Sequence, residues 1–286
     1  MTATTLSPTP SSMPEALRAK VAGSSFYAGM RILPRAEREA MFAIYGFCRI
    51  VDDIADDQQA PRDQRGAMLA DWRRWIGALY RGGDTGQAGF LAQAVRDFAL
   101  EEADFLAVIE GMQMDVDADI QWPTFALLDH YCDCVASAVG RLSVNIFGMD
   151  RAEGVHLAHH LGRALQFTNI LRDLDEDAEI ARVYLPIEAL THAGIHPTTP
   201  TTLMQDPGMD SAARWLAARA EAHFVAAGAC LAARPKGRLI APRLMAEAYA
   251  LVLRRMLAQG WHAPRRRVST SKPRLLFSLI RHLVMG

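Results

Sequence analysis

The chain has 286 residues, 50% hydrophobic and 22% charged, which is typical of a folded globular protein and not of a disordered or fibrous one. Its 31 Lys and Arg nearly balance its 32 Asp and Glu, so the basic excess common in nucleic-acid-binding proteins is missing. Four cysteines are too few for a disulfide framework, which favours a reducing compartment. Neither a signal peptide nor an apolar run of about 20 residues is visible, so we expect a cytoplasmic protein.

Helical periodicity dominates the chain after residues 1–13, a Ser/Thr/Pro-rich segment that we expect to be disordered. Pro34 and Pro61 each open a predicted helix, and Gly82 follows the second one. The predicted helices cover residues 35–57, 61–80, 87–100, 101–117, 125–147, 151–177, 209–231 and 239–260, with a loop at 195–207. The sequence shows no alternating pattern typical of strands. These features predict one all-α domain, residues 14–286, in which a central cavity could lie between the long helices.

An acidic cluster ends the first long predicted helix. Asp52, Asp53 and Asp56 are three or four residues apart, so their carboxylates share one helix face. Like charges this close repel, and the helix macrodipole disfavours them at a C-terminus. A divalent cation would remove the conflict, and hard oxygen ligands suit Mg²⁺. Tyr45 and Arg49 continue the spacing and could bind phosphate near the same face, although Arg49 could instead form a salt bridge with Asp53.

A second acidic cluster lies between residues 166 and 177. Asn169, Asp173 and Asp177 recur every four residues and are therefore predicted to share a helix face. Arg172 lies beside them, and Arg182 follows the predicted helix end. A solvated acidic helix end is the alternative for either cluster alone. Two such clusters, each following an apolar helix and each with an Arg, favour a diphosphate held between two carboxylate walls by bridging Mg²⁺.

Two further motifs give weaker signals. Residues 115–119 begin like a calcium loop but lack the Gly at its sixth position and the closing Glu, so we expect a solvated helix end, although Asp115 could border the pocket. His156, His159 and His160 have helical spacing without an HExxH pattern, and we expect them on a surface helix.

Four groups of residues are similar in sequence to one known family. They are residues 24–34 with 43–56, residues 131–140, residues 166–186, and Tyr249 with residues 265–268. Together they span about residues 22–268 and resemble the squalene/phytoene synthase family, most of all its bacterial branch in hopanoid biosynthesis. The family often has a His just before the Ser-Phe element, where this chain has Ala22 or Gly23, so no role of that His carries over.

The resemblance implies the all-α isoprenoid synthase fold and a head-to-head (1′–1) condensation of two prenyl diphosphates. Two farnesyl diphosphates would give presqualene diphosphate and pyrophosphate, with Mg²⁺, or alternatively Mn²⁺, as cofactor and without NADPH. The implied metal ligands are Asp52, Asp53, Asp56, Asn169, Asp173 and Asp177. The implied catalytic residues are Tyr45, Arg49, Arg172 and Tyr249. The implied substrate-binding residues are Ser25, Phe26, Tyr131, Gln166, Arg182 and Arg267, with Arg266 as an alternative to Arg267.

Other functions remain open on sequence grounds. The same fold could make phytoene from geranylgeranyl diphosphate, or squalene with NADPH. A non-catalytic helical scaffold that binds cations or a basic partner is a further alternative. The expected partners are farnesyl diphosphate and downstream enzymes of the same pathway, and no nucleic acid. The basic C-terminus, residues 273–286, could rest on anionic lipid at the inner face of the membrane or pack on the core as a last helix.

Overall fold

The computed structural model describes residues 30, 31 and 33–268. Ser25, Phe26, the segment 1–13 and the basic tail 273–286 lie outside the described residues, and what the sequence predicts for them stays a prediction. Within the described residues, regular structure is helical apart from one isolated parallel bridge between Gln121 and Val183. The prediction of an all-α fold is therefore confirmed.

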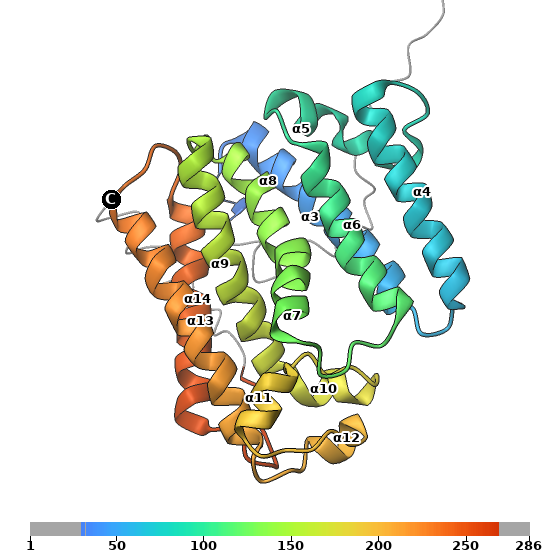
Figure 1. The fold of residues 1–286 in the computed structure, drawn as a ribbon. Coiled ribbons are helices and arrows are strands. Elements are labelled where there is room, and N and C mark those ends of the chain that lie inside the picture. Colours follow the sequence, from blue (N-terminus) through green and yellow to red (C-terminus); the bar gives the residue numbers. More distant parts are fainter. Residues whose placement is uncertain (1–29, 32, 269–286) are drawn as a thin grey trace, which may run out of the picture.

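The described helices follow one another in the order shown in Figure 1. They are α3 (Arg35–Asp56), α4 (Arg62–Arg81), η1 (Gly86–Leu91), α5 (Ala92–Asp97), α6 (Glu102–Asp117), α7 (Phe125–Cys132), η2 (Asp133–Ser137), α8 (Ala138–Ile146), α9 (Arg151–Arg172), α10 (Leu174–Glu179), α11 (Ile187–His192), α12 (Pro200–Leu203), α13 (Met209–Ala232) and α14 (Ile240–Gln259). No helix among them is long and apolar enough to cross a membrane.

Helix α9 lies in the middle of the bundle (Figure 1). It packs against α13 and α14 on one side and against α7 and α8 on the other. Helix α6 packs against α8, α3 and α4 and so extends the bundle away from α9. The short helices α10, α11 and α12 gather at the C-terminal end of α9. This arrangement brings the end of α9 and the segments that follow it to one end of the bundle.

Two hydrophobic clusters hold the helices together. The first joins α3, α4, α6 and α8 around Phe47, whose ring contacts the rings of Trp72 and Phe105; all three are almost fully buried. The second joins the C-terminal half of α9 to α11, α13 and α14, with Phe167 and Trp261 in it. Burial of large apolar side chains is the main favourable contribution to folding. The two clusters therefore hold α3 and α9 in place, and the acidic segments lie at the C-terminal ends of these two helices.

The predicted helix 125–147 contains a π-helical turn, η2, between α7 and α8. Two glycines let neighbouring helices approach this turn closely. A Cβ on Gly162 of α9 would lie 2.8 Å from backbone atoms of Ser137, and one on Gly111 of α6 would lie 2.4 Å from Val135 Cγ1. Sequence periodicity does not reveal a π turn, because one wide turn barely disturbs a 3.6-residue repeat.

Other predicted bounds also need correction. The predicted helix 151–177 breaks at Asp173, where φ is −106° and ψ is 20°, and continues as α10. The predicted helix 87–100 is a 3₁₀ segment followed by the short α5, and α12 lies within the predicted loop 195–207. Helix α11 was not predicted.

Candidate active site

The first acidic cluster occupies the last turn of α3. Arg49 binds two of its members, because Nη1 donates to Asp52 Oδ2 over 2.5 Å and Nη2 donates to Asp53 Oδ1 over 3.0 Å. The salt bridge expected as an alternative for Arg49 is therefore present. No basic residue in the last turn of α3 offsets the macrodipole. The opposite face of the helix carries Val51 and Ile54 into the core, so the carboxylates face away from it.

The second acidic cluster straddles the junction between α9 and α10. The junction keeps the helical spacing, since Asp173 N donates to Asn169 O over 2.9 Å and Asp177 N donates to Asp173 O over 2.8 Å. Asp173 also binds two guanidiniums: Arg172 Nε donates over 2.8 Å and Arg267 Nη2 over 2.7 Å. The four-residue repeat of the sequence therefore persists, although one continuous helix does not.

Arg182 connects the two clusters. Its Nη1 donates to Asp56 Oδ1 over 2.7 Å and its Nη2 donates to Ala55 O over 3.3 Å, although 126 residues separate Arg182 from Asp56. The Arg182 side chain is only 5% exposed, and Arg182 N donates to Asp177 O over 2.9 Å. One buried arginine thus holds the end of α3 against the segment that follows α10. We call Asp52, Asp53, Asp56, Asn169, Asp173 and Asp177 together the acidic site.

Asp115 belongs to the same region, and the expectation of a solvated helix end is wrong for it. The residue is 4% exposed and accepts hydrogen bonds from Tyr131 Oη over 2.8 Å and from Tyr184 Oη over 2.7 Å. Its charge raises the pKa of Asp52 and of Asp177, so it lies close to both clusters. The sequence contains an indication that Asp115 is buried. Asp115 follows the apolar Met112 by three residues, so both side chains lie on the buried face of α6.

The acidic site carries more negative charge than its surroundings neutralise. Burial, followed by the charge of Asp56, raises the pKa of Asp52 to about 6. Burial, followed by the charge of Asp173, raises the pKa of Asp177 to about 7. Desolvation and neighbouring like charges both disfavour the ionised carboxylate, which is the sense of these shifts.

The donor set fits a hard divalent cation. Asn169 Oδ1 is buried and has no hydrogen-bond partner among the described residues, while its Nδ2 donates to Gln166 Oε1 over 3.4 Å. A buried carbonyl oxygen without a donor is costly, and a metal ion would satisfy it. Carboxylate and amide oxygens are ligands of the kind that Mg²⁺ prefers. The oxygens of the acidic site could therefore hold Mg²⁺.

The remaining predicted site residues lie around this centre. Tyr249 of α14 is 4% exposed and hydrogen-bonds to Arg172, and Tyr131 stacks on Tyr184 with ring centroids 5.1 Å apart. Arg267 reaches Asp173, whereas Arg266 forms no ion pair with the residues that the structure describes. Trp261 and residues 265–268, together with α9, α10 and α14, line an open pocket of about 210 Å³. Tyr45, half-buried on α3, lies two turns before Asp52.

Sequence comparison places the chain in a known class. The family model of squalene/phytoene synthases matches residues 19–274. The chain therefore belongs to the squalene/phytoene synthase family, as the motifs predicted, and is an enzyme of this prenyltransferase class.

The relatives within the family are close. The chain is 57% identical over 258 residues to a presqualene diphosphate synthase of Zymomonas mobilis, covering 90% of this chain and 88% of that protein. It is 50% identical over 272 residues to a presqualene diphosphate synthase of Rhodopseudomonas palustris, covering 95% and 97%. A solved dehydrosqualene synthase structure shares the fold, with a TM-score of 0.77, 24% identity and 94% of each chain covered.

Proposed function

We propose that this enzyme condenses two farnesyl diphosphates head-to-head (1′–1) to presqualene diphosphate, with release of pyrophosphate and dependence on Mg²⁺. Two observations carry the proposal: the Arg182 bridge holds the two acidic segments together, and the buried Asn169 Oδ1 of the second segment has no hydrogen-bond partner among the described residues. The name shared by the two relatives supports the choice of product.

The carboxylates of the acidic site hold the cation in this proposal. When bound there, Mg²⁺ would withdraw charge from the leaving diphosphate and so favour ionisation of the allylic C1–O bond. Arg49, Arg172 and Arg267 now bind Asp52, Asp53 and Asp173, and each carries N–H donors in a geometry that suits phosphate oxygens. Transfer of these guanidiniums to the diphosphate would stabilise the leaving group as its charge develops.

The second substrate then closes the ring. The 2,3 double bond of the second farnesyl diphosphate attacks C1 of the allylic cation, and loss of one proton forms the cyclopropane, while the second diphosphate is kept. The departing pyrophosphate accepts that proton, either directly or through the Tyr249 hydroxyl, which takes up the proton and passes its own proton to the pyrophosphate. Tyr249 is buried beside Arg172, so it lies next to the group proposed to hold the leaving diphosphate. The central apolar cavity that would exclude water from the cation stays a prediction.

The test is a product analysis with purified protein. Incubation with farnesyl diphosphate and Mg²⁺, without NADPH, is expected to release one pyrophosphate for each presqualene diphosphate, identified by mass spectrometry after dephosphorylation. Parallel incubations contain geranylgeranyl diphosphate, or farnesyl diphosphate with NADPH. Phytoene from the first, or squalene in the second with little presqualene diphosphate left, would replace the proposed product. Absence of pyrophosphate release from every substrate would favour a binding scaffold.

A further inference from the structure

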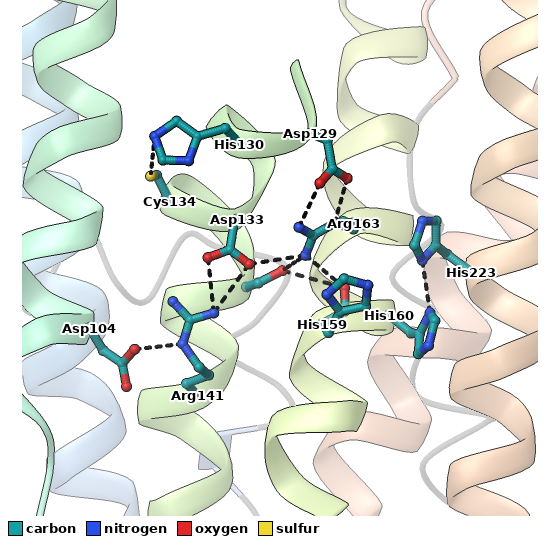
Figure 2. A network of polar contacts seen from close by, with 11 residues as sticks. Asp104, Asp129, His130, Asp133, Cys134, Arg141, His159, His160, Arg163 and His223 are labelled. Atoms are coloured by element: carbon teal, nitrogen blue, oxygen red, sulfur yellow. Dashed lines mark hydrogen bonds and ion pairs between the residues drawn. The ribbon is translucent and has the colours of Figure 1, made fainter. Parts of the chain in front are cut away.

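Three histidines meet away from the acidic site, between α9 and α13. The sequence predicts a surface helix for His156, His159 and His160. His156 is exposed, as predicted, whereas His159 and His160 are half-buried and face His223 of α13 (Figure 2). His160 Nδ1 and His223 Nδ1 are 2.9 Å apart. One ring nitrogen from each of the three residues lies within 4.8 Å of the other two. The sequence could not indicate this cluster, since His223 is 63 residues from His160.

The backbone holds the three rings in place. Helices α9 and α13 pack along each other, so the positions of the three Cα atoms are set by the bundle rather than by a loop. The ring centroids of His159 and His160 lie 4.8 Å apart, and those of His160 and His223 lie 5.1 Å apart. Sites built on helices keep their ligand geometry better than sites on loops.

The charges around the cluster permit a cation. Arg163 is the nearby positive group, but its guanidinium donates to Asp129 Oδ1 over 2.6 Å and to Asp133 Oδ1 over 3.1 Å (Figure 2). Burial is the first cause that lowers the pKa of His159, of His160 and of His223, and the pKa of His223 falls to about 4. The lowered pKa of each ring favours the neutral imidazole, which is the form that binds metals.

We propose that His159, His160 and His223 form a binding site for a divalent transition-metal cation, represented by Zn²⁺, separate from the oxygen ligands of the acidic site. Imidazole suits zinc, copper and nickel, whereas Mg²⁺ selects oxygen ligands. Zn–N bonds of about 2.0–2.1 Å at a tetrahedral ion place two nitrogens about 3.3 Å apart. The observed 2.9 Å between His160 and His223 needs only a small outward ring rotation, which exchanges one hydrogen bond for two metal bonds.

A tetrahedral ion needs a fourth ligand besides the three histidines. His156 lies one turn before His160, with ring centroids 4.7 Å apart, and it is exposed. Water or His156 would complete a four-coordinate ion. A metal here would join α9 to α13 and stabilise the folded state, because the unfolded chain does not hold the three rings together.

The test uses the full-length protein, stripped of metals and then saturated with Mg²⁺ to occupy the acidic site. Zn²⁺ is titrated with binding followed by calorimetry and by the rise in Tm, and Co²⁺ is used as a visible-spectrum probe of the ligands. We expect one Zn²⁺ per chain, and Co²⁺ bands typical of tetrahedral nitrogen coordination without a thiolate charge-transfer band. His160→Gln and His223→Gln should each weaken Zn²⁺ binding by at least about 100-fold, since loss of a residue that only orients a ligand costs about 10- to 100-fold.

Two control variants locate the site. His192→Gln removes an exposed histidine of α11 and should leave Zn²⁺ binding unchanged. His130→Gln should also leave it unchanged, although His130, Glu110 and Cys134 form the other described group that could hold a metal. Equal Zn²⁺ binding by the wild type and His160→Gln, loss of binding in His130→Gln, or no Zn²⁺ binding by the wild type would each overturn the proposal. If a variant fails to fold, the wild-type Co²⁺ spectrum decides, because absent bands or a thiolate band contradict a three-histidine site.

Discussion

Two polar regions of this enzyme contain partly buried carboxylates, and they differ in how far arginines of the same chain neutralise these carboxylates. In the first, which we call the Arg163 network, Arg163 is bound by Asp129 and Asp133, and Asp133 in turn receives a bond from Arg141 (Figure 2). Arg163 also donates to Ser137 Oγ over 3.0 Å. The hydrogen bond from Arg163 is the main cause that lowers the pKa of Asp129. Each carboxylate here is stabilised by a guanidinium of the same chain.

In the acidic site, by contrast, negative charge exceeds the positive charge that the neighbouring arginines supply. The pKa values of Asp52 and Asp177 are raised to about 6 and about 7, and Asn169 Oδ1 lacks a partner among the described residues. In the Arg163 network, guanidiniums of the same chain therefore neutralise the carboxylates. In the acidic site, we propose that a bound cation does so. The comparison predicts that substitutions in the first region affect stability and that substitutions in the second affect turnover.

The largest expected effect is on turnover, from the double variant Asp52→Asn with Asp56→Asn. Both amides keep the size of the carboxylates, and the new amide oxygen at position 56 can still accept from Arg182, but two negative ligands are lost. We expect Mg²⁺-dependent pyrophosphate release to fall by about 1000-fold or more, because metal charge stabilisation supplies several kcal/mol. The metal-free Tm should stay the same or rise, since repulsion is relieved. Asp57→Asn, at an exposed neighbour, is the control and should stay active; undiminished turnover in the double variant would contradict the assignment.

The next effect is on stability, from Arg163→Met in the Arg163 network. The Arg163 side chain is 5% exposed, while Asp129 and Asp133 are 38% and 33% exposed. Removing one partner of a buried ion pair costs about 3–5 kcal/mol, so partial exposure of the carboxylates suggests about 2–4 kcal/mol here. Urea unfolding measures this loss. Adding Asp129→Asn should recover part of the stability, and the turnover of the folded fraction should change little; a large loss of turnover at full stability would reverse the comparison.

A smaller effect concerns pH and Mg²⁺ together. Asp52 and Asp177 have raised pKa values in the folded state, so their contribution to stability is present below the unfolded pKa of 3.8 and is lost as pH rises through about 6 to 7. In the proposed function Mg²⁺ binds the ionised carboxylates, so its binding should reverse that loss of stability. We expect Mg²⁺ to raise the Tm by about 3–6 °C near about pH 8, for about 1–2 kcal/mol, and to have no measurable effect near about pH 5.

The difference in Tm with and without Mg²⁺ is the quantity to measure, because other groups titrate in the same range. The lowered pKa of His223 makes stability rise with pH between about 4 and 6.5, against the trend of the two carboxylates. This histidine contribution cancels in the difference. A Mg²⁺ effect that is equal at both pH values would show that the acidic site does not bind the ion through these carboxylates.

Local spacing in the sequence is enough to predict both acidic clusters, because residues three and four apart share a helix face whatever the rest of the fold does. It cannot predict the Arg182–Asp56 bond or the meeting of His160 with His223, since these contacts depend on how distant helices pack. The helix break at Asp173 escapes prediction because local hydrogen bonds preserve the four-residue repeat across it. The acidic neighbours of Asp115 indicate a solvated helix end, whereas its place on the buried face of α6 decides its surroundings.

The smallest effect tests Asp115 through one hydroxyl group. Tyr184→Phe removes the hydrogen bond from Tyr184 Oη to Asp115 Oδ1 and leaves the one from Tyr131. A hydrogen bond to a charged group contributes about 1.5–3 kcal/mol, so we expect a stability loss near the lower end because one donor remains. Asp115 then orients less firmly beside Arg182, and the Mg²⁺ concentration for half-maximal turnover should rise by about 3- to 10-fold.

Tyr80→Phe is the matched control for this substitution. Tyr80 Oη donates to the backbone oxygen of Leu100 over 2.8 Å in the first hydrophobic cluster, so its loss removes a tyrosine hydrogen bond to a neutral acceptor at a distance from the acidic site. Both variants should lose stability in urea unfolding, but only Tyr184→Phe should change the Mg²⁺ requirement. If the two variants differ in neither measurement, Asp115 stabilises the fold without positioning the acidic site. Its substitution would then affect stability alone, as we expect for the Arg163 network.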